Sequence, residues 1–478
     1  MIRTVLVTVI ALVAGVAYAS PASAVEAVRD DISRYQPISD RKYQRYLSLY
    51  HMTDTERQAI IRGLTVHTNS LSRSPVLRPL FVIYGPPRGK APPQAILLRV
   101  DIRNYRWKAE TWEKLAQVNV WFNVDRSKGK DKSYPAARWL PYKSIGFVLA
   151  ATDSQVPIVR ADTFFVQTVV SADRVAGYYE WLGLKNRNDF FVMVGADRKK
   201  SDALLKRWAA VILKSGIAIN NRIVERESII DGGLWRTRDA FKPQTGRRNA
   251  LNTLDDFAHD AEEMIAPLPN GLFAYYLSSV GGVQQDSAPD QVGSDSTTTS
   301  NDHRIHAYLS CVRCHGINGG LRNLNDFGRR LFQGKQRLVV VGDQSKLEKL
   351  EALYLRPLNR HLKRDIDEYT FTLRDLLGPT ANGSDIGTLY TELWDKWHDT
   401  EVTLEQAARE VGTVTGNQLR KALQHYATPR SEGGLGRVLP NSLLGFTKDE
   451  PSSMLREHWE ESFDTVQFIL EQTRGVEK

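Results

Sequence analysis

The chain has 478 residues, of which 42% are hydrophobic and 25% are charged, so it is too long for one hydrophobic core and apolar enough to build two or three domains. Its formal net charge is +9, but Lys and Arg are scattered along the sequence, and we expect no specific acidic partner from the charge alone. Only two cysteines are present, which excludes a disulfide framework as the source of stability.

The first 24 residues have the organisation of a secretory signal peptide. Arg3 precedes an apolar run at residues 5–16, small residues follow at 17–19 and 22–24, and we expect cleavage after Ala24. The apolar run is shorter than the roughly 20 residues that span a bilayer, and no later stretch comes closer. The sequence therefore predicts a soluble protein that is periplasmic or otherwise exported, with no transmembrane segment after cleavage.

Residues 25–284 are predicted to form a mixed α+β region. AILLRVDIRNYRW (95–107) alternates apolar and charged side chains as a half-buried strand does, and VPIVRADTFFVQTVV (156–170) is rich in the β-branched and aromatic residues of strands. SDALLKRWAAVILKSG (201–216) has helical spacing and begins at a capping residue, Ser201. We therefore predict strands in the first two segments and a helix in the third.

Residues 285–342 are predicted to hold a polar loop followed by the segment that carries both cysteines. SCVRCHG (310–316) matches the C-x-x-C-H attachment motif of c-type haem. Cysteines at i and i+3 of a helical turn lie on one side, where each sulfur can add to a haem vinyl group, and the adjacent histidine ligates the iron. The sequence thus predicts one covalent heme c on Cys311 and Cys314, with His315 as the proximal iron ligand.

Two other uses of a cysteine pair are considered. A structural zinc site needs four ligands with more sulfur, and a thioredoxin-like redox pair follows a strand in a βαβ unit. Neither context is found near Cys311 and Cys314 in the sequence. An exported binding protein with a redox C-x-x-C is kept as the remote alternative.

The helix that carries the motif is predicted to begin at Asn301 or Asp302. His306 would then lie on the same helix as His315, roughly 13 Å away along the axis, which is too far for both to bind one iron. His303 and His306 are therefore expected at the surface or at the haem edge.

The distal iron ligand is expected upstream of the motif, because the next methionine after it is the distant Met454. The candidates are His259 and Met264, which precede a turn rich in proline and glycine. A thioether ligand would give a higher reduction potential than an imidazole. A five-coordinate iron, or ligation by His361 or His398, stays open.

Residues 343–478 are predicted to be mainly helical. Thr403 and Thr415 each stand three residues before a glutamine, which is the pattern of a capping box. Residues 403–424 have the outline of a helix-turn-helix, but export argues against DNA, so we expect ordinary helix packing and no nucleic-acid partner. The four helical segments are residues 343–355, 403–411, 417–427 and 454–472.

A longer pattern surrounds the cysteine motif. HDAEEMIAPLPNGLFAYYL (259–277) and DSAPDQVGSDST (286–297), followed by SCVRCHG, resemble large exported single-haem c-type cytochromes of bacteria, in which His-Asp-Gly-Gly-Glu leads into Leu-Pro-Asn-Gly-Leu and then C-x-x-C-H. This chain has Ala261-Glu262 in place of Gly-Gly, which argues against a close backbone approach there. Shorter similarities extend over most of the chain, at residues 68–75, 97–107, 160–165, 215–226 and 402–412.

The resemblance implies haem binding, electron transfer and a redox partner protein that the sequence does not identify, and it favours His259 over Met264 as distal ligand. A haem-dependent oxidoreductase or peroxidase-like enzyme with an open iron position is the alternative, with His259, Asp260 and Glu263 as candidate acids and bases. The sequence leaves open whether the protein is an enzyme.

Overall fold

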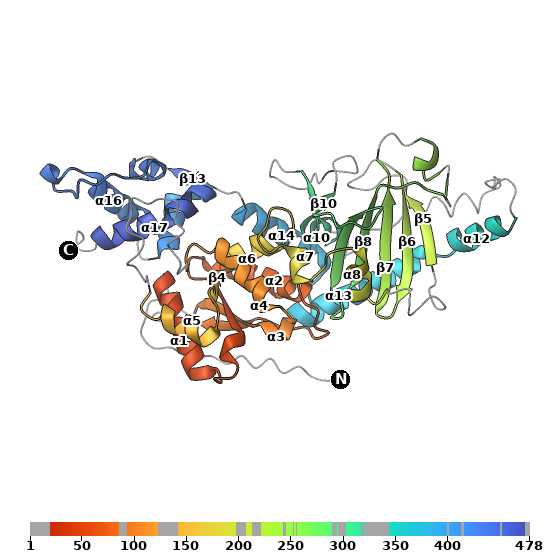
Figure 1. Ribbon diagram of the computed structural model, residues 1–478, viewed down its shortest axis with the longest axis horizontal. Coiled ribbons are helices and arrows are strands. Elements are labelled where there is room, and N and C mark those ends of the chain that lie inside the picture. The colour runs from red at the N-terminus through yellow and green to blue at the C-terminus, as the bar shows by residue number, and fades with distance from the viewer. Residues whose placement is uncertain are drawn as a thin grey trace.

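The computed structural model in Figure 1 has an α+β fold, as the sequence predicts. No described helix combines the length and the apolar composition that a membrane span requires. The described residues are 20–85, 93–122, 142–196, 207–212, 221–241, 245–251, 253–254, 256–288, 294, 303–316, 321, 344–398, 401–412, 415–449 and 452–473.

The N-terminal part is built on a four-stranded sheet in the order β2-β3-β1-β4. Strand β1 pairs antiparallel with β3 and parallel with β4. The strands are β1 (Gln44–Ser48), β2 (Phe81–Tyr84), β3 (Ala95–Asp101) and β4 (Ile158–Arg160). The helices of this part are α1 (Pro21–Tyr35), α2 (Asp54–Ser70), α3 (Ile102–Tyr105), α4 (Ala109–Glu113), α5 (Ile145–Thr152), α6 (Ala161–Thr168), α7 (Tyr178–Trp181) and α8 (Arg187–Met193).

The predicted cleavage point after Ala24 falls in the first turn of α1. The Ser20 side chain accepts a hydrogen bond from the Ser23 backbone N–H and caps this helix, and Pro21 occupies its first turn. Ala24 and Val25 are buried in the core. Cleavage there would remove the cap and the start of a packed helix; the preceding part of the predicted signal peptide lies outside the described residues.

The two strand predictions in this part are each half correct. Residues 95–107 begin as β3, but the chain turns into α3 because the Asp101 side chain accepts the Arg103 backbone N–H and starts a helical turn. Residues 156–170 form only the short β4 before α6 begins. Phe164 and Phe165 are fully buried on α6, so tertiary packing has overridden their strand propensity.

A second, five-stranded sheet runs as an antiparallel meander in the order β5-β6-β7-β8-β9. Helix α13 crosses one of its faces, and α10 and α14 lie beside it (Figure 1). The elements are β5 (Arg207–Ile212), β6 (Arg222–Ile229), β7 (Gly232–Asp239), β8 (Ala261–Pro267), β9 (Phe273–Ser279), the β10 (Ser287–Ala288) and β11 (Ile305–His306) ribbon, α10 (Leu309–Gly316), α12 (Gln344–Tyr354), α13 (Leu358–Leu377) and α14 (Gly383–Trp397).

The helix prediction for residues 201–216 is wrong in the described part of that segment. Residues 207–212 form β5, which pairs with β6. Trp208 and Ala210 face one hydrophobic cluster while Ala209 and Val211 face another, so both sides of the strand are apolar. A strand buried on both faces has a continuous apolar run, which spacing alone does not distinguish from a helix. Ser201 lies outside the described residues.

The C-terminal part is helical, with one small β-ribbon, and confirms the predicted caps. The Thr403 hydroxyl accepts the Gln406 backbone N–H, and Thr415 forms a full capping box with Gln418. Helix α12 and this part's three helices match the four predicted segments. The elements here are β12 (Glu401–Thr403), α15 (Leu404–Val411), α16 (Gly416–Ala427), β13 (Ser453–Leu455) and α17 (Arg456–Thr473).

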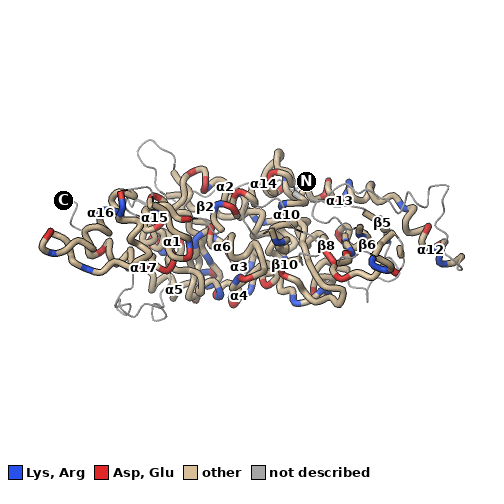
Figure 2. The backbone as a smooth tube through the Cα atoms, turned by 90° about the horizontal axis from the view of Figure 1, so that it is seen from above, with Lys and Arg blue, Asp and Glu red and all other residues tan. Residues whose placement is uncertain are grey.

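The two large hydrophobic clusters cross the predicted domain boundaries. On one face of the N-terminal sheet, Leu47 and Leu98 belong to a cluster that includes the second sheet, α10, α13 and α14. On the other face, Tyr46 and Leu97 pack in a cluster with α1 and the C-terminal helices. Residues of both signs of charge are distributed along the whole length of the molecule (Figure 2).

Candidate functional site

The cysteine motif lies on α10, which begins later than predicted. Ile305 and His306 form β11 rather than the first turn of a helix, so His306 and His315 do not share one. Tyr308, between β11 and α10, has a φ of 71°, which is unusual for a large side chain. Backbone conformations of this kind concentrate at functional sites and hold the following segment in a fixed direction.

Helix α10 is held against α14. The hydroxyls of Tyr308 and Tyr390 lie 3.0 Å apart, and Arg313 Nε donates to Thr391 Oγ1 at 3.1 Å. At the start of α10, the Ser310 hydroxyl accepts the His306 backbone N–H. These contacts hold the start and the middle of the helix.

The three motif side chains differ in burial. Cys311 is 2% exposed and Cys314 is 7% exposed, whereas the His315 side chain is 20% exposed. The sulfurs lie one helical turn apart in the core, and the imidazole sits at its edge. The motif residues therefore have the spacing on a helix that covalent haem attachment requires.

A cluster of buried tyrosines surrounds Cys311. Tyr178 stacks on Tyr308 with 4.3 Å between ring centroids, and Tyr275 contacts the rings of both Tyr308 and His315. Burial raises the pKa of the Tyr178 and Tyr275 hydroxyls well above the usual value, with Cys311 among the smaller causes. These phenols therefore stay neutral at physiological pH and give the motif an aromatic environment.

His315 faces the second sheet at Glu263 of β8. Its Nε2 lies 3.4 Å from Glu263 Oε1, and its buried Nδ1 has no hydrogen-bond partner among the described residues. The Glu263 carboxylate also lies 3.6 Å from Arg222 Nη1, and Arg222 Nε lies 2.7 Å from Asp239 Oδ1. A chain of charges thus runs from His315 across β8, β7 and β6.

This chain of charges borders a cavity of about 240 Å³ at one end of the sheet. Burial raises the pKa of the Asp239 carboxyl; Arg222 opposes that rise and Glu263 adds to it. The cavity is lined by both charged and apolar residues. Its principal lining residues are Arg222, Asp239, Glu263, Leu277, Ala288 and Ile305.

The structure places Met264 away from His315. Successive residues of a strand point to opposite faces of the sheet. Glu263 meets His315 on one face, so Met264 points to the other, where it is fully buried opposite Tyr276. The two side chains are therefore not brought together.

His259 has a different partner. Its Nε2 lies 3.1 Å from Glu262 Oε1, and Glu262 points to the face opposite Glu263 and is also paired with Arg187. Asp260, the other candidate base, is held by Arg248 and by a backbone N–H. Of the three acid–base candidates, the fold brings Glu263 to His315.

The remaining histidine candidates pack against tryptophans. The tilted rings of His361 and Trp208 lie 4.2 Å apart between centroids, and His398 stacks on Trp394 at 3.9 Å. His306 lies 6.2 Å from the same Trp394 ring. Within the described residues, no group of three or more His, Cys, Asp or Glu side chains is arranged to hold a metal ion directly.

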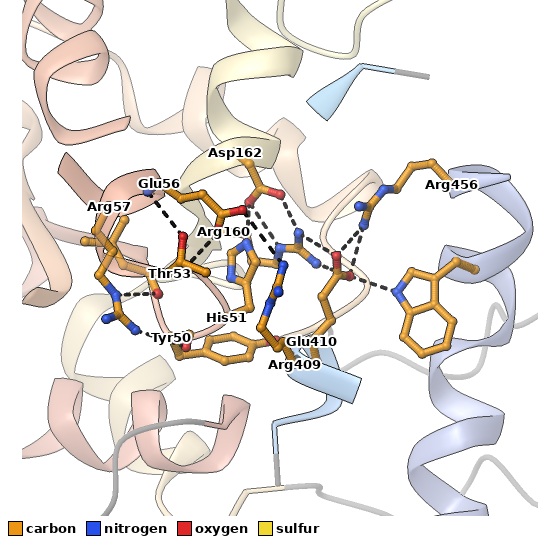
Figure 3. Close-up of polar contacts among 12 residues, drawn as sticks. Tyr50, His51, Thr53, Glu56, Arg57, Arg160, Asp162, Arg409, Glu410 and Arg456 are labelled. Atoms are coloured by element: carbon orange, nitrogen blue, oxygen red, sulfur yellow. Dashed lines mark hydrogen bonds and ion pairs between the residues drawn. The ribbon is translucent and has the colours of Figure 1, made fainter. Parts of the chain in front are cut away.

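A second polar cluster, shown in Figure 3, joins the N-terminal sheet to the C-terminal helices. Arg160 at the end of β4 is fully buried and pairs with both Asp162 and Glu410 of α15. Glu410 also accepts hydrogen bonds from Arg456 at 2.7 Å and from Trp459 Nε1 at 2.8 Å. Donors from these three residues identify Glu410 as an ionised carboxylate.

The pKa values in this cluster follow from its geometry. Burial alone would raise the pKa of Glu410, but Arg160 and Arg456 outweigh it and lower the pKa to about 2. The pKa of His51, whose Nε2 lies 3.3 Å from Asp162, is lowered by burial first and by Arg160 second. The cluster is therefore a buried ionic junction between two parts of the chain.

Sequence reasoning missed this junction and also Arg222. A usable signal existed: Arg160 and Asp162 lie in RADTFF, Glu410 lies in VTLEQAAREVG, and Arg222 lies in SGIAINNRIVER, all segments of the cytochrome resemblance.

Comparison of the chain with protein-family models, with curated proteins and with solved structures finds no match.

Proposed function

We propose that this chain is an exported c-type cytochrome that binds one haem covalently and transfers electrons. The observation that carries the proposal is the C-x-x-C-H sequence on a helical turn whose histidine Nε2 faces Glu263, a residue that lines a cavity. The secretory signal pattern of the N-terminal residues supports it, because haem is attached to such motifs outside the cytoplasm.

Cys311 and Cys314 would hold the haem and His315 would ligate its iron. Each thiol would add its S–H across a haem vinyl group, with sulfur bonded to one carbon and hydrogen to the other, so neither an oxidant nor a reductant would be consumed. The haem would supply one-electron chemistry; the chain supplies position and environment.

The environment of the motif is asymmetric. Tyr178, Tyr275 and Tyr308 enclose the side of Cys311 with aromatic rings, which keeps water from that side. Glu263 and Arg222 provide charges on the side of His315. Burial and nearby charge are two of the means by which a protein sets a haem potential.

The test is expression with export and haem maturation, followed by a pyridine haemochrome spectrum and intact mass. The proposal expects a red protein whose mass exceeds the polypeptide by one haem and whose two thiols resist alkylation. A colourless protein with both thiols open to alkylation would overturn it and leave the redox C-x-x-C reading.

A haem-dependent oxidoreductase is the second candidate, favoured by the carboxylate that faces His315 Nε2. Electron-transfer cytochromes lock a sixth ligand in place, whereas enzymes keep that position open beside an acid or base. The described contacts bring Glu263, and not Met264, to His315. A high-spin ferric spectrum and carbon monoxide binding would favour this candidate; a low-spin six-coordinate spectrum would favour the first.

A further inference from the structure

The cavity at the end of the second sheet is large enough for a small organic molecule. Asp239 and Ala261 pair across β7 and β8, Ala288 and Ile305 pair across the β10–β11 ribbon, and all four residues line it. Its volume of about 240 Å³ exceeds the ~150 Å³ of an engineered apolar cavity that binds benzene. One substituted six-membered ring therefore fits between the sheet and the ribbon.

One hydrogen-bond donor of the cavity has no acceptor. Arg222 is 4% exposed and lines the cavity, and its buried Nη2 has no hydrogen-bond partner within the described part of the chain. Asp260 also lines the cavity but is already paired with Arg248, and Glu262 is paired with Arg187 in the same way. A buried donor without an acceptor is costly, and an acceptor atom of a bound molecule would remove that cost.

The charge of Arg222 is already balanced, which decides the kind of acceptor. Asp239 Oδ1 lies 2.7 Å from its Nε, and Glu263 Oε2 lies 3.6 Å from its Nη1. A carboxylate bound at Nη2 would add a third negative charge to this buried place, where repulsion between like charges is strong. A carbonyl oxygen accepts the same hydrogen bond without that repulsion, so the site favours a neutral ligand.

The remainder of the ligand would meet apolar side chains. Apolar walls with a few oriented polar groups are typical of sites for small molecules. The larger apolar residues that line the cavity are Phe241, Leu277, Val280 and Ile305.

We propose that this cavity binds small neutral carbonyl compounds of the aromatic ketone class, with Arg222 Nη2 donating a hydrogen bond to the carbonyl oxygen and the ring lying against the apolar walls. This site goes beyond the proposed cytochrome function and does not depend on a haem. Its described lining residues include none of Cys311, Cys314 and His315, so the ligand is not placed on the iron.

Titration calorimetry of the exported mature protein tests the choice of a neutral head group. Acetophenone and benzoate share one ring and differ in charge. Acetophenone is expected to bind with a dissociation constant of about 1 mM or below, and benzoate at least about tenfold more weakly. Equal or tighter binding of benzoate would overturn the inference. No binding of either probe would mean that the cavity holds water only, and would overturn it too.

Two variants locate the binding. Arg222→Lys keeps the positive charge beside Asp239 but removes Nη2, and should weaken acetophenone binding at least about tenfold because a hydrogen bond from a charged donor is lost. Ala288→Phe fills the cavity and should abolish the binding of acetophenone. Because Ala288→Phe leaves every charge in place, it also covers the case in which the lysine variant fails to fold. Unchanged acetophenone binding in Ala288→Phe would place the ligand elsewhere and overturn the inference.

The matched control is Arg238→Lys. Arg238 follows Arg222 on the neighbouring strand β7 but points to the opposite face from Asp239, where it pairs with Glu225, so acetophenone affinity should not change. A pyridine haemochrome spectrum of the same preparation keeps the two proposals apart. A colourless protein that binds acetophenone would overturn the cytochrome proposal alone, and a haem protein that binds no acetophenone would overturn this one alone.

Discussion

Replacing Glu410 by glutamine is expected to destabilise the folded chain by about 3 kcal/mol at pH 7. Arg160 and Arg456 lower the pKa of the buried Glu410 from 4.5 to about 2, and each pKa unit corresponds to about 1.4 kcal/mol. A carboxyl whose pKa is lower in the folded state stabilises the fold above its unfolded-state pKa. Glutamine keeps the shape and part of the hydrogen bonding but not the charge.

The stabilisation by Glu410 should depend on pH in a defined direction. The contribution of Glu410 is complete above pH 4.5 and is lost as the pH falls toward 2. At pH 3 about 1 kcal/mol remains, so the difference between the parent and Glu410→Gln should shrink by about 2 kcal/mol between pH 7 and pH 3.

Urea unfolding followed by far-ultraviolet circular dichroism at both pH values measures this difference. Glu457→Gln is the matched control, because Glu457 is an exposed carboxylate on α17 near the same junction, and its variant should stay within about 0.5 kcal/mol of the parent. If the cost of Glu410→Gln is the same at pH 7 and pH 3, the carboxylate charge does not stabilise the junction and the reasoning fails.

Three further outcomes are expected. Cys314→Ser should keep haem on the denatured chain through Cys311, and the variant with serine at both positions should lose it. Covalent haem on that double variant would contradict attachment through these cysteines. Tyr308→Phe should cost about 1–3 kcal/mol in urea unfolding, since the buried Tyr390 hydroxyl loses its partner; an unchanged midpoint would contradict this. The mature N-terminus should be Ser20, because Ser20 caps α1, and intact mass will identify it. A mass that lacks residues 20–24 as well would contradict this and support cleavage after Ala24.

The sequence predicts elements well where one local signal decides them. The threonine caps at Thr403 and Thr415 are local, so α15 and α16 begin where expected. Residues 207–212 and α6 were assigned wrongly because burial on two faces and packing against other helices are properties of the whole fold. The same holds for Ile305, which pairs with β10 rather than joining the motif helix.

In the candidate site, too, only residues that are neighbours in the sequence could be predicted together. Cys311, Cys314 and His315 are adjacent in sequence, and their spacing is sufficient to suggest covalent haem. Arg222 reaches Glu263 only through the register of three strands, which spacing does not reveal. His259 and Met264 remain predictions as iron ligands. His259 contacts Glu262, and Met264 lies on the face opposite Glu263 because successive strand residues point to opposite faces of the sheet.

The hydrophobic cluster shared by α1 and the C-terminal helices has a consequence for the order of assembly. Val25 and Leu97 share this cluster with residues such as Val402 and Phe463, which come far later in the chain. The first part of the chain therefore cannot complete its packing until the final helices arrive. Cys311 is almost inaccessible once the chain is folded, so the proposed haem attachment would have to take place before the molecule closes.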